Sequence, residues 1–214
     1  MKILKSNLST LLLMSAVNLC LISSTQAALI QWTPADGGNN HWYEALAESG
    51  GISWADANTT ANAAGGYLAT ITTTAENNFV FSLMGNADYW VHSPAGSYLG
   101  PWFGGLKNIS DWQWVTNEPF TFTNWSPGEP NNAAPYEDRL MFLSYSPQPT
   151  ALWNDYSDST AVQYGFPIGY IVEYNTAPVP IPGSIWLLGT SLAGLIRLNR
   201  KGRKCGGERS TSIT

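Results

Sequence analysis

The clearest periodic pattern of hydrophobic positions lies between residues 53 and 66. Apolar side chains recur there at the three- and four-residue spacing of one helix face: Trp54, Ala57, Ala61 and Ala64. Ser53 precedes the run as an N-cap candidate, with Asp56 three residues on, and Gly65-Gly66 follow it. These are start and stop signals of a helix. The pattern therefore predicts a helix that begins after Ser53 and ends at the glycine pair.

A second helix is predicted a few residues further on. Thr74 starts it, Glu76 places a negative charge in its first turn, and Gly85 ends it. Three apolar side chains are expected to point inward from this helix: Phe79, Val80 and Leu83.

Short runs rich in aromatic and branched residues are typical of strands. They are residues 67–71, 102–106, 112–115, 140–143, 152–153 and 170–174. Two helices and several short strands predict a domain of the α+β class. Residues 117–135 are crowded with Pro, Asn, Gly and Thr, which predicts a long loop, and long loops inside compact domains are usually functional.

Five side chains in and after this loop carry oxygen atoms at a distinctive spacing: Glu129, Asn131, Glu137, Asn154 and Asp155. Calcium takes about six to eight oxygen ligands from carboxylates and amide carbonyls, so a loop kinked by Pro130 can wrap it. Nitrogen and sulfur ligands are distant, because His41 and His92 lie well upstream and the two cysteines lie near the chain ends. The donor set predicts a calcium site.

Three segments of this set, Glu129-Pro130-Asn131, Glu137-Asp138 and Trp153-Asn154-Asp155, resemble the calcium and sugar site of C-type lectin domains. Further landmarks of that family occur in its order: Tyr43-Glu44, Ser53-Trp54-Ala55-Asp56-Ala57, Gly66-Tyr67-Leu68-Ala69-Thr70-Ile71, Trp102-Phe103-Gly104-Gly105-Leu106, Trp114, Asn124-Trp125 and Gly169-Tyr170-Ile171-Val172-Glu173-Tyr174. The resemblance covers roughly residues 40–175. It implies a C-type-lectin-like fold with two helices, small antiparallel sheets and a long calcium-binding loop.

The resemblance also implies roles for the five side chains. All five would be ligands of Ca²⁺: Glu129, Asn131, Glu137, Asn154 and Asp155. The first four would also bind two vicinal hydroxyls of a sugar, with the hydroxyls donating to the glutamates and accepting from the amide groups. In that family Glu-Pro-Asn goes with mannose-type sugars. The resemblance also implies that the Glu129–Pro130 peptide bond is cis, which costs little before proline. The loop is expected to be mobile without calcium and ordered with it.

The predicted domain contains no cysteine, whereas members of the family usually carry disulfides. Arg139 and Val172 stand where family cysteines are expected. A disulfide contributes about 2–4 kcal/mol, which burial of a few extra aromatic side chains, at about 1.5–3 kcal/mol each, can replace. Nine of the ten tryptophans lie between residues 28 and 177 and supply such side chains.

Both chain ends carry export signals. Lys2 and Lys5 precede an apolar run, and small residues end it at Ala27, so residues 1–27 are predicted to be a secretory signal peptide. Residues 28–177 would be the lectin-like domain. Residues 178–204 combine a Pro motif, a short apolar run and a basic cluster, and they resemble a PEP-CTERM sorting segment. Residues 205–214 form a tail.

That second resemblance implies a bacterial protein exported through the inner membrane, held there transiently by the hydrophobic helix of its tail, and cut by an exosortase-type enzyme. The product would sit at the cell surface or in the extracellular matrix. Ile181 stands where the glutamate of the sorting motif is expected, which leaves the cleavage position open. A simple membrane anchor is the alternative, although the apolar run is shorter than the about 20 residues that a spanning helix needs.

The net charge of the predicted domain excludes one class of partner. Between residues 28 and 180 only Lys107 and Arg139 are basic, against 14 acidic residues, which gives a difference of −12. Such a domain repels phosphate backbones, so nucleic acid is excluded as a partner. Carbohydrate, including an exopolysaccharide, is the partner that the resemblance to C-type lectins implies.

Several of these residues also have other interpretations. The donor segments alone also fit a polar turn, and Asp138 with Asn132 fit either a second calcium site or solvated polar groups. Core packing is the preferred role of Trp125 and Trp153, and structural or surface roles are preferred for His41 and His92. We expect no enzyme, because carboxylates that share a cation stay ionised and no Ser-His-Asp or Cys-His set is present. A calcium-independent lectin-like module of an extracellular matrix, structural or adhesive, is the alternative function.

Overall fold

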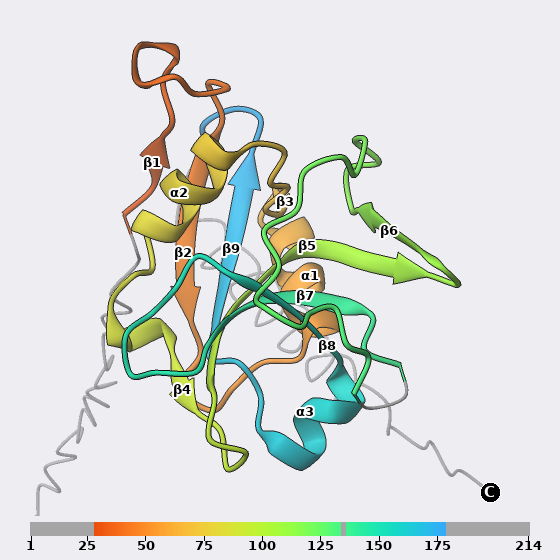
Figure 1. The fold of residues 1–214 in the computed structure, drawn as a ribbon. Coiled ribbons are helices and arrows are strands. Elements are labelled where there is room, and N and C mark those ends of the chain that lie inside the picture. The colour runs from red at the N-terminus through yellow and green to blue at the C-terminus, as the bar shows by residue number, and fades with distance from the viewer. Residues whose placement is uncertain (1–27, 134–135, 179–214) are drawn as a thin grey trace, which may run out of the picture.

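The computed structural model describes residues 28–133 and 136–178 (Figure 1). The predicted signal peptide and nearly all of the predicted sorting segment and tail lie outside the described residues. Within the described ranges, no helix is long and apolar enough to cross a membrane.

Nine strands form one open sheet in the described part of the chain. Their bounds are β1 Ile30–Gln31, β2 Trp42–Ala47, β3 Tyr67–Leu68, β4 Val91–His92, β5 Tyr98–Asn108, β6 Asp111–Trp114, β7 Arg139–Ser144, β8 Trp153–Tyr156 and β9 Gly169–Tyr174. The main path runs β1-β2-β9-β5-β7-β8, with β3 paired to β9, and β4 and β6 paired to β5. All pairs are antiparallel except β5 with β9, which meet at Trp102 and Tyr170. The small antiparallel sheets predicted from the sequence are thus joined at one parallel bridge.

Both predicted helices are present. α1 spans Trp54–Ala63, and the Ser53 hydroxyl accepts a hydrogen bond from the Asp56 backbone N–H at 3.0 Å. The chain leaves the helix through Gly65, whose φ of 83° favours glycine. α2 spans Thr74–Ser82 and ends three residues before Gly85. Its N-cap is Thr73, one residue before the predicted start, because the Thr73 hydroxyl accepts from the Glu76 N–H at 3.1 Å.

Several elements were not predicted. The third helix, α3, spans Asp158–Tyr164, so the count of two helices was wrong. Two 3₁₀ turns also occur, η1 at Pro34–Asp36 and η2 at Ala87–Tyr89. Strand β2 pairs with β9 along its whole length, yet its sequence contains Ala and Glu, which are uncommon in strands. Seven helical residues, as in α3, are too few to show a helical period.

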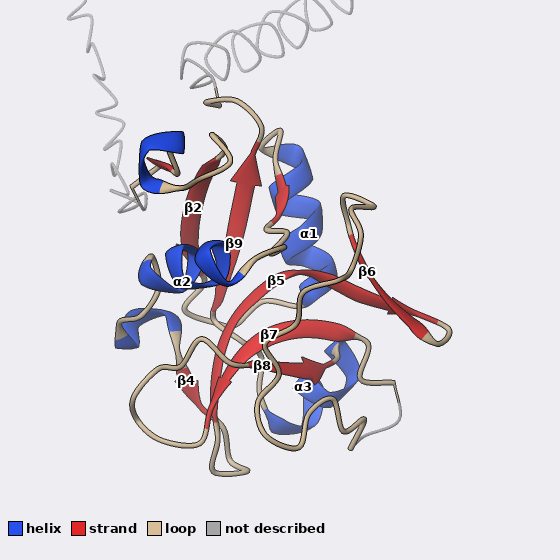
Figure 2. Ribbon diagram, turned by 45° about the horizontal axis from the view of Figure 1, so that its top comes forward, coloured by secondary structure: helices blue, strands red, loops and turns tan. Residues whose placement is uncertain are grey.

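α1 and α2 cover opposite faces of the β2–β9 pair (Figure 2). Side chains alternate along β9, so Ile171 packs in the cluster that contains Val80 of α2, while Val172 packs with Ala57 and Ala61 of α1. Each helix therefore closes one half of the core.

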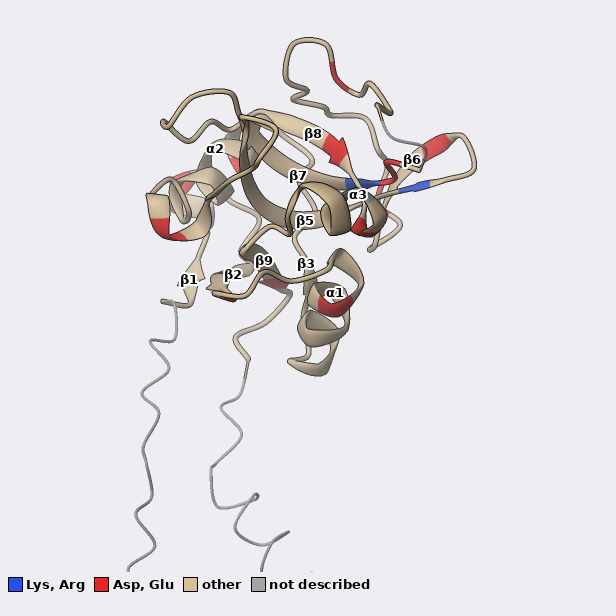
Figure 3. Ribbon diagram, turned by 90° about the horizontal axis from the view of Figure 1, so that it is seen from below, with Lys and Arg blue, Asp and Glu red and all other residues tan. Residues whose placement is uncertain are grey.

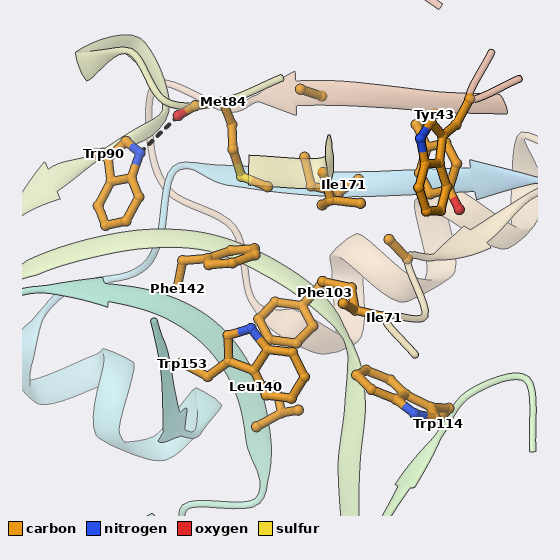
Figure 4. Packing of buried hydrophobic residues seen from close by; sticks show 14 residues of the cluster. Tyr43, Ile71, Met84, Trp90, Phe103, Trp114, Leu140, Phe142, Trp153 and Ile171 are labelled. Carbon is orange, nitrogen blue, oxygen red and sulfur yellow. Dashed lines mark hydrogen bonds between the residues drawn. The ribbon is translucent and has the colours of Figure 1, made fainter. Parts of the chain in front are cut away.

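Aromatic side chains from β5, β7 and β8 fill the centre of the α2-side cluster (Figure 4). The Phe103 ring lies 4.8 Å from Phe142 and 5.2 Å from Trp153, measured between ring centroids. Trp153 is fully buried, and its Nε1 donates to the Asn77 Oδ1 of α2 at 2.7 Å. The preferred core role of Trp153 is confirmed.

Polar contacts connect α1, β7 and α3 where the family would carry a cysteine. Arg139 lies over the Trp54 ring at 4.7 Å from its centroid. The carboxylate of Asp158 accepts from the Trp54 backbone N–H at 2.7 Å, at the start of α1. The other cysteine position, Val172, is fully buried. The two positions thus contribute a stacked cation and an apolar contact.

The long predicted loop is present between β6 and β7. It runs beside β8, because Trp153 N donates to Asn124 O and Ser126 N donates to Trp153 O, each at 2.9 Å. This contact brings the Glu-Pro-Asn segment next to Asn154 and Asp155, the residues that follow Trp153 on β8.

Candidate functional site

Asp155 fixes the loop against the sheet. Its side chain is fully buried, and its two oxygens accept from the backbone N–H groups of Asn131 and Asn132 at 3.1 and 2.9 Å. The Glu129–Pro130 peptide bond is cis, as the resemblance implied. Asn132 has a φ of 47°, the left-handed region that Asn tolerates better than most residues. The backbone therefore turns sharply around the Asp155 carboxylate.

Glu137 closes the turn from the other end of the loop. Its side chain is buried and accepts from the Ala133 N–H at 2.8 Å, while its own N–H donates to the Asn132 Oδ1 at 3.1 Å. The Oδ1 of Asn131 also accepts from Ala133 N–H, at 2.6 Å. The loop thus uses its own carboxylate and amide oxygens to bind its own backbone.

Four of the five predicted site residues line one pocket of about 300 Å³: Glu129, Asn131, Glu137 and Asn154. Asp155 does not line it, but it holds two residues of the loop that does. Asn154 is buried and donates through Nδ2 to the Asp155 carbonyl. The structure therefore brings together side chains that are up to 26 positions apart in the sequence, from Glu129 to Asp155.

Negative charge in the pocket is poorly compensated. Burial raises the pKa of Glu129, and the nearby charge of Asp155 raises it further, against hydrogen bonds from the Tyr145 hydroxyl and the Asn131 N–H. The two basic residues of the described ranges lie on β5 and β7 (Figure 3), and neither lines the pocket. Lys107 lies over the Trp112 ring, and Arg139 pairs with Asp138 at 3.0 Å. The pocket therefore favours a cation.

The oxygen donors are of the kind that calcium binds, but their carboxylates do not converge on one point. Among the described residues, no three Asp, Glu, His or Cys side chains converge on one point. Two of the pocket donors are asparagine amides, which are ordinary calcium ligands. The carboxylates of Asp155 and Glu137 accept from loop N–H groups. The calcium site stays a prediction, with residues that are of the right kind and near one another.

The remaining sequence candidates make contacts within the fold. The ion pair with Arg139 is consistent with Asp138 as a solvated charge. Trp125 is partly buried and lies edge-on to Trp153, with 6.0 Å between ring centroids. His41 Nδ1 lies 2.6 Å from the buried carboxylate of Glu173, and this hydrogen bond raises the pKa of His41. His92 is exposed and contacts a tyrosine ring.

Tyr145 is a pocket residue that sequence reasoning missed. It lies just after β7, is 65% exposed, and donates its hydroxyl hydrogen to the Glu129 Oε1 at 3.1 Å. Its neighbours, Ser144, Ser146 and Pro147, mark only a polar turn. No local signal distinguishes this tyrosine, because its role depends on the distant loop that folds against it.

The family model "Lectin C-type domain" matches residues 51–164 of the chain. A perlucin-like protein of Mytilus galloprovincialis is 36% identical over 84 residues, which are 39% of this chain and 51% of that protein. "C-type lectin domain family 4 member G" of Mus musculus is 26% identical over 133 residues, 62% of this chain and 40% of that protein. The chain thus spans about half or less of the length of these two relatives.

A solved C-type lectin structure has the same overall fold as this chain. The cow C-type carbohydrate-recognition domain of CD23, determined in the presence of GlcNAc2Man3 oligosaccharide, superposes with a TM-score of 0.51 at 20% identity. The match covers 70% of this chain and 95% of that domain. It confirms the overall fold predicted from the sequence.

Proposed function

The chain belongs to the C-type lectin domain family, whose members are carbohydrate-binding domains, and we propose that it is a calcium-dependent glycan-binding protein. The observation that carries the proposal is the convergence of Glu129, Asn131, Glu137 and Asn154 on one pocket beside Asp155. These are the five side chains whose types and spacing predict the site.

The proposed ligands of Ca²⁺ are the five oxygen donors Glu129, Asn131, Glu137, Asn154 and Asp155. Bound calcium would supply a centre that accepts two neighbouring hydroxyl oxygens of a sugar. Asp155 already orients the loop by accepting from Asn131 N–H and Asn132 N–H. Its replacement by a residue without a carboxylate would therefore remove both a proposed ligand and the acceptor that fixes the loop.

The protein side of sugar recognition is a matched set of donors and acceptors. The carboxylates of Glu129 and Glu137 accept from sugar hydroxyl groups, and the amide groups of Asn131 and Asn154 donate to the hydroxyl oxygens. Vicinal equatorial hydroxyls, as in mannose-type sugars, fit this alternation. The Tyr145 hydroxyl, which donates to Glu129, orients that carboxylate at the pocket edge.

The same site gives no support to an enzyme. Catalysis by a carboxylate pair requires one carboxyl group to act as a proton donor, and a shared cation keeps both ionised. We therefore propose binding without turnover.

The proposal includes export and surface sorting, which depend on residues 1–27 and 178–204. Separation of whole cells, membranes and medium, followed by mass spectrometry of both chain ends, tests this part. Ends at about residue 28 and near the Pro motif at residues 179–182 are expected. An intact chain in the cytoplasm would contradict it.

Glycan binding is tested with the purified protein on an array of mannose-type and galactose-type sugars, in calcium and then in a chelator. We expect binding to mannose-type sugars that the chelator abolishes and added calcium restores. The variant Glu129→Gln should lose binding, whereas Glu118→Gln, an exposed acid in the same loop, should keep it. Binding that persists in the chelator would overturn calcium dependence.

A further inference from the structure

The chain contains a short motif that the proposed function does not use. Asn-X-Ser/Thr, in which X is not proline, is the acceptor motif for N-linked glycans in exported proteins. The motif occurs three times in the described part of the chain, at Asn58-Thr59-Thr60, Asn108-Ile109-Ser110 and Asn124-Trp125-Ser126. Three residues match such a motif easily by chance, so the residue types do not distinguish the three copies. Their surroundings in the fold do.

The first copy lies within α1, where its polar groups are already covered or bound. The Oδ1 of Asn58 is buried, and the Asn58 backbone carbonyl accepts from the Asn62 Nδ2 at 2.7 Å. The Thr60 hydroxyl, the second polar group of the motif, donates to the Asp56 carbonyl at 2.9 Å. A glycan is bulky and belongs on the surface, so the folded helix leaves no room for one at Asn58.

The third copy supports the long loop. The Asn124 Nδ2, the atom that a glycan would modify, donates to the Ala151 carbonyl at 2.6 Å. Ser126 is only 3% exposed, and its N–H donates to the Trp153 carbonyl at 2.9 Å. Modification of Asn124 would break the contact between the loop and the segment before β8, so this copy is structural in the folded protein.

The second copy forms the tip of the β5–β6 hairpin, which projects from the body of the domain (Figure 1, Figure 2). Asn108 pairs with Asp111, so Ile109 and Ser110 form the turn of the hairpin. Ile109 is 99% exposed, and Asn108 and Ser110 are exposed as well. An enzyme can therefore reach the whole motif in the folded protein.

The polar groups of this second copy are available. The side-chain amide of Asn108 has no hydrogen-bond partner among the residues that the structure describes. The Ser110 hydroxyl makes one hydrogen bond, at the surface, to the adjacent Asp111 carboxylate at 3.2 Å. The stem of the hairpin does not depend on either group, because the Lys107 Nζ lies over the Trp112 ring at 5.9 Å from its centroid. The motif thus joins a free acceptor to a stable support.

We propose that Asn108 is the acceptor of an N-linked glycan, and that Asn58 and Asn124 stay unmodified. The donor is a sugar or oligosaccharide carried on a lipid diphosphate. The Asn108 side-chain nitrogen bonds to the anomeric carbon of the sugar, and the bond from that carbon to the diphosphate breaks. The lipid diphosphate leaves with the electron pair and takes up the proton that the amide loses. This inference rests on the proposed export, not on the proposed glycan binding.

The modified position is separate from the proposed binding site. None of residues 107–112 lines the pocket that contains Glu129, Asn131, Glu137 and Asn154. A glycan at Asn108 would therefore cover the hairpin tip and leave the calcium and sugar affinities of the pocket unchanged.

The test is mass spectrometry of the exported protein as its own host produces it, after digestion into peptides that separate Asn58, Asn108 and Asn124. Two variants from the same host are compared with the wild type. Ser110→Ala keeps the acceptor and removes the hydroxyl of the motif, whereas Ser110→Thr restores a complete motif. Both replace an exposed side chain, so both should melt like the wild type.

In the wild type and in Ser110→Thr, the Asn108 peptide should be heavier than its sequence by whole sugar residues, and Ser110→Ala should lose this shift. The Asn58 and Asn124 peptides should have their sequence masses in all three proteins. An unmodified Asn108 in a chain that has lost residues 1–27, or a glycan at Asn58 or Asn124 instead, would overturn the proposal and leave export standing. An intact chain in the cytoplasm would overturn export and this modification together.

Discussion

At the scale of single residues, the site is built around carboxylates that serve the fold before any ligand arrives. Asp155 is fully buried and accepts from two backbone N–H groups of the loop. Asn154, its neighbour, lines the pocket, and its side chain makes one hydrogen bond among the described residues, to the Asp155 carbonyl. The two adjacent residues should therefore differ sharply in what their removal does without calcium.

Replacement of Asp155 by Ala should lower the free energy of unfolding in a chelator by about 1–3 kcal/mol, because the N–H groups of Asn131 and Asn132 lose a fully buried acceptor. Asn154→Ala should change it by less than about 1 kcal/mol, since only one hydrogen bond is removed. Urea denaturation of both variants in a chelator measures the difference. Equal losses would contradict the clamp role of Asp155.

A second residue-scale prediction concerns His41. Its hydrogen bond to buried Glu173 raises its pKa above the ordinary value of 6.5, and the charges of Glu76 and Glu118 act in the same direction, against burial. A base with a raised pKa stabilises the fold fully below about pH 6.5 and loses that contribution as the pH rises through its folded pKa.

We therefore expect stability to fall above about pH 6.5 by about 1 kcal/mol, after allowance for partial solvent screening. Thermal melting of the wild type and of His41→Gln between pH 6 and pH 9 checks it, because the variant should lack this slope. Parallel curves for both proteins would show that His41 does not titrate in this range.

Residue types and spacing were enough to predict the donor set. The prediction was possible because oxygen-bearing side chains cluster around a proline-kinked loop and directly after Trp153. They are Glu129, Asn131, Glu137, Asn154 and Asp155. Tyr145 and Tyr164 could not be predicted in this way, because tyrosines occur throughout the core and only the fold places these two beside the pocket.

At the scale of elements, the local sequence signals were strong for α1. They were weak for elements that form because of contacts with distant parts of the chain. Ser53 and Gly65 delimit α1 by local chemistry, which a sequence displays directly. Strand β2 forms because β9 lies beside it along six residue pairs, and α3 forms where its first carboxylate reaches α1. Such long-range causes leave no periodic pattern.

The contact between α3 and α1 gives an element-scale prediction. Asp158→Ala should destabilise the protein by about 1–2 kcal/mol, the usual loss when an acceptor at a helix N-terminus is removed. Asp158→Asn keeps an acceptor oxygen and should lose less. The pair is compared by thermal melting, and an Ala variant as stable as the Asn variant would show that the contact contributes nothing.

The long loop between β6 and β7 gives a second element-scale prediction. Its amide groups at Asn131, Asn132 and Ala133 donate to side chains of the proposed calcium site. If calcium orders the loop, hydrogen exchange across residues 117–133 should slow on addition of calcium, while exchange in α1 stays unchanged. Exchange that is insensitive to calcium in both segments would contradict the proposed ordering.

At the scale of the whole molecule, the fold has a large aromatic core and a contact between Arg139 and the Trp54 ring. Trp102, Trp114 and Trp153 are among its largest fully buried side chains. The domain also carries a strong excess of negative charge, with 14 acidic and two basic residues between positions 28 and 180. Because like charges repel in the compact state, a bound cation should stabilise the folded protein by mass action.

Calcium titration of residues 28–180, by calorimetry and thermal melting, tests the central claim most directly, with an Asn154→Ala, Asp155→Ala double variant in parallel. The account predicts saturable binding to the wild type with a melting temperature that rises with calcium, and neither effect in the variant. A wild type that binds no calcium at millimolar concentration, with an unchanged melting temperature, would contradict it.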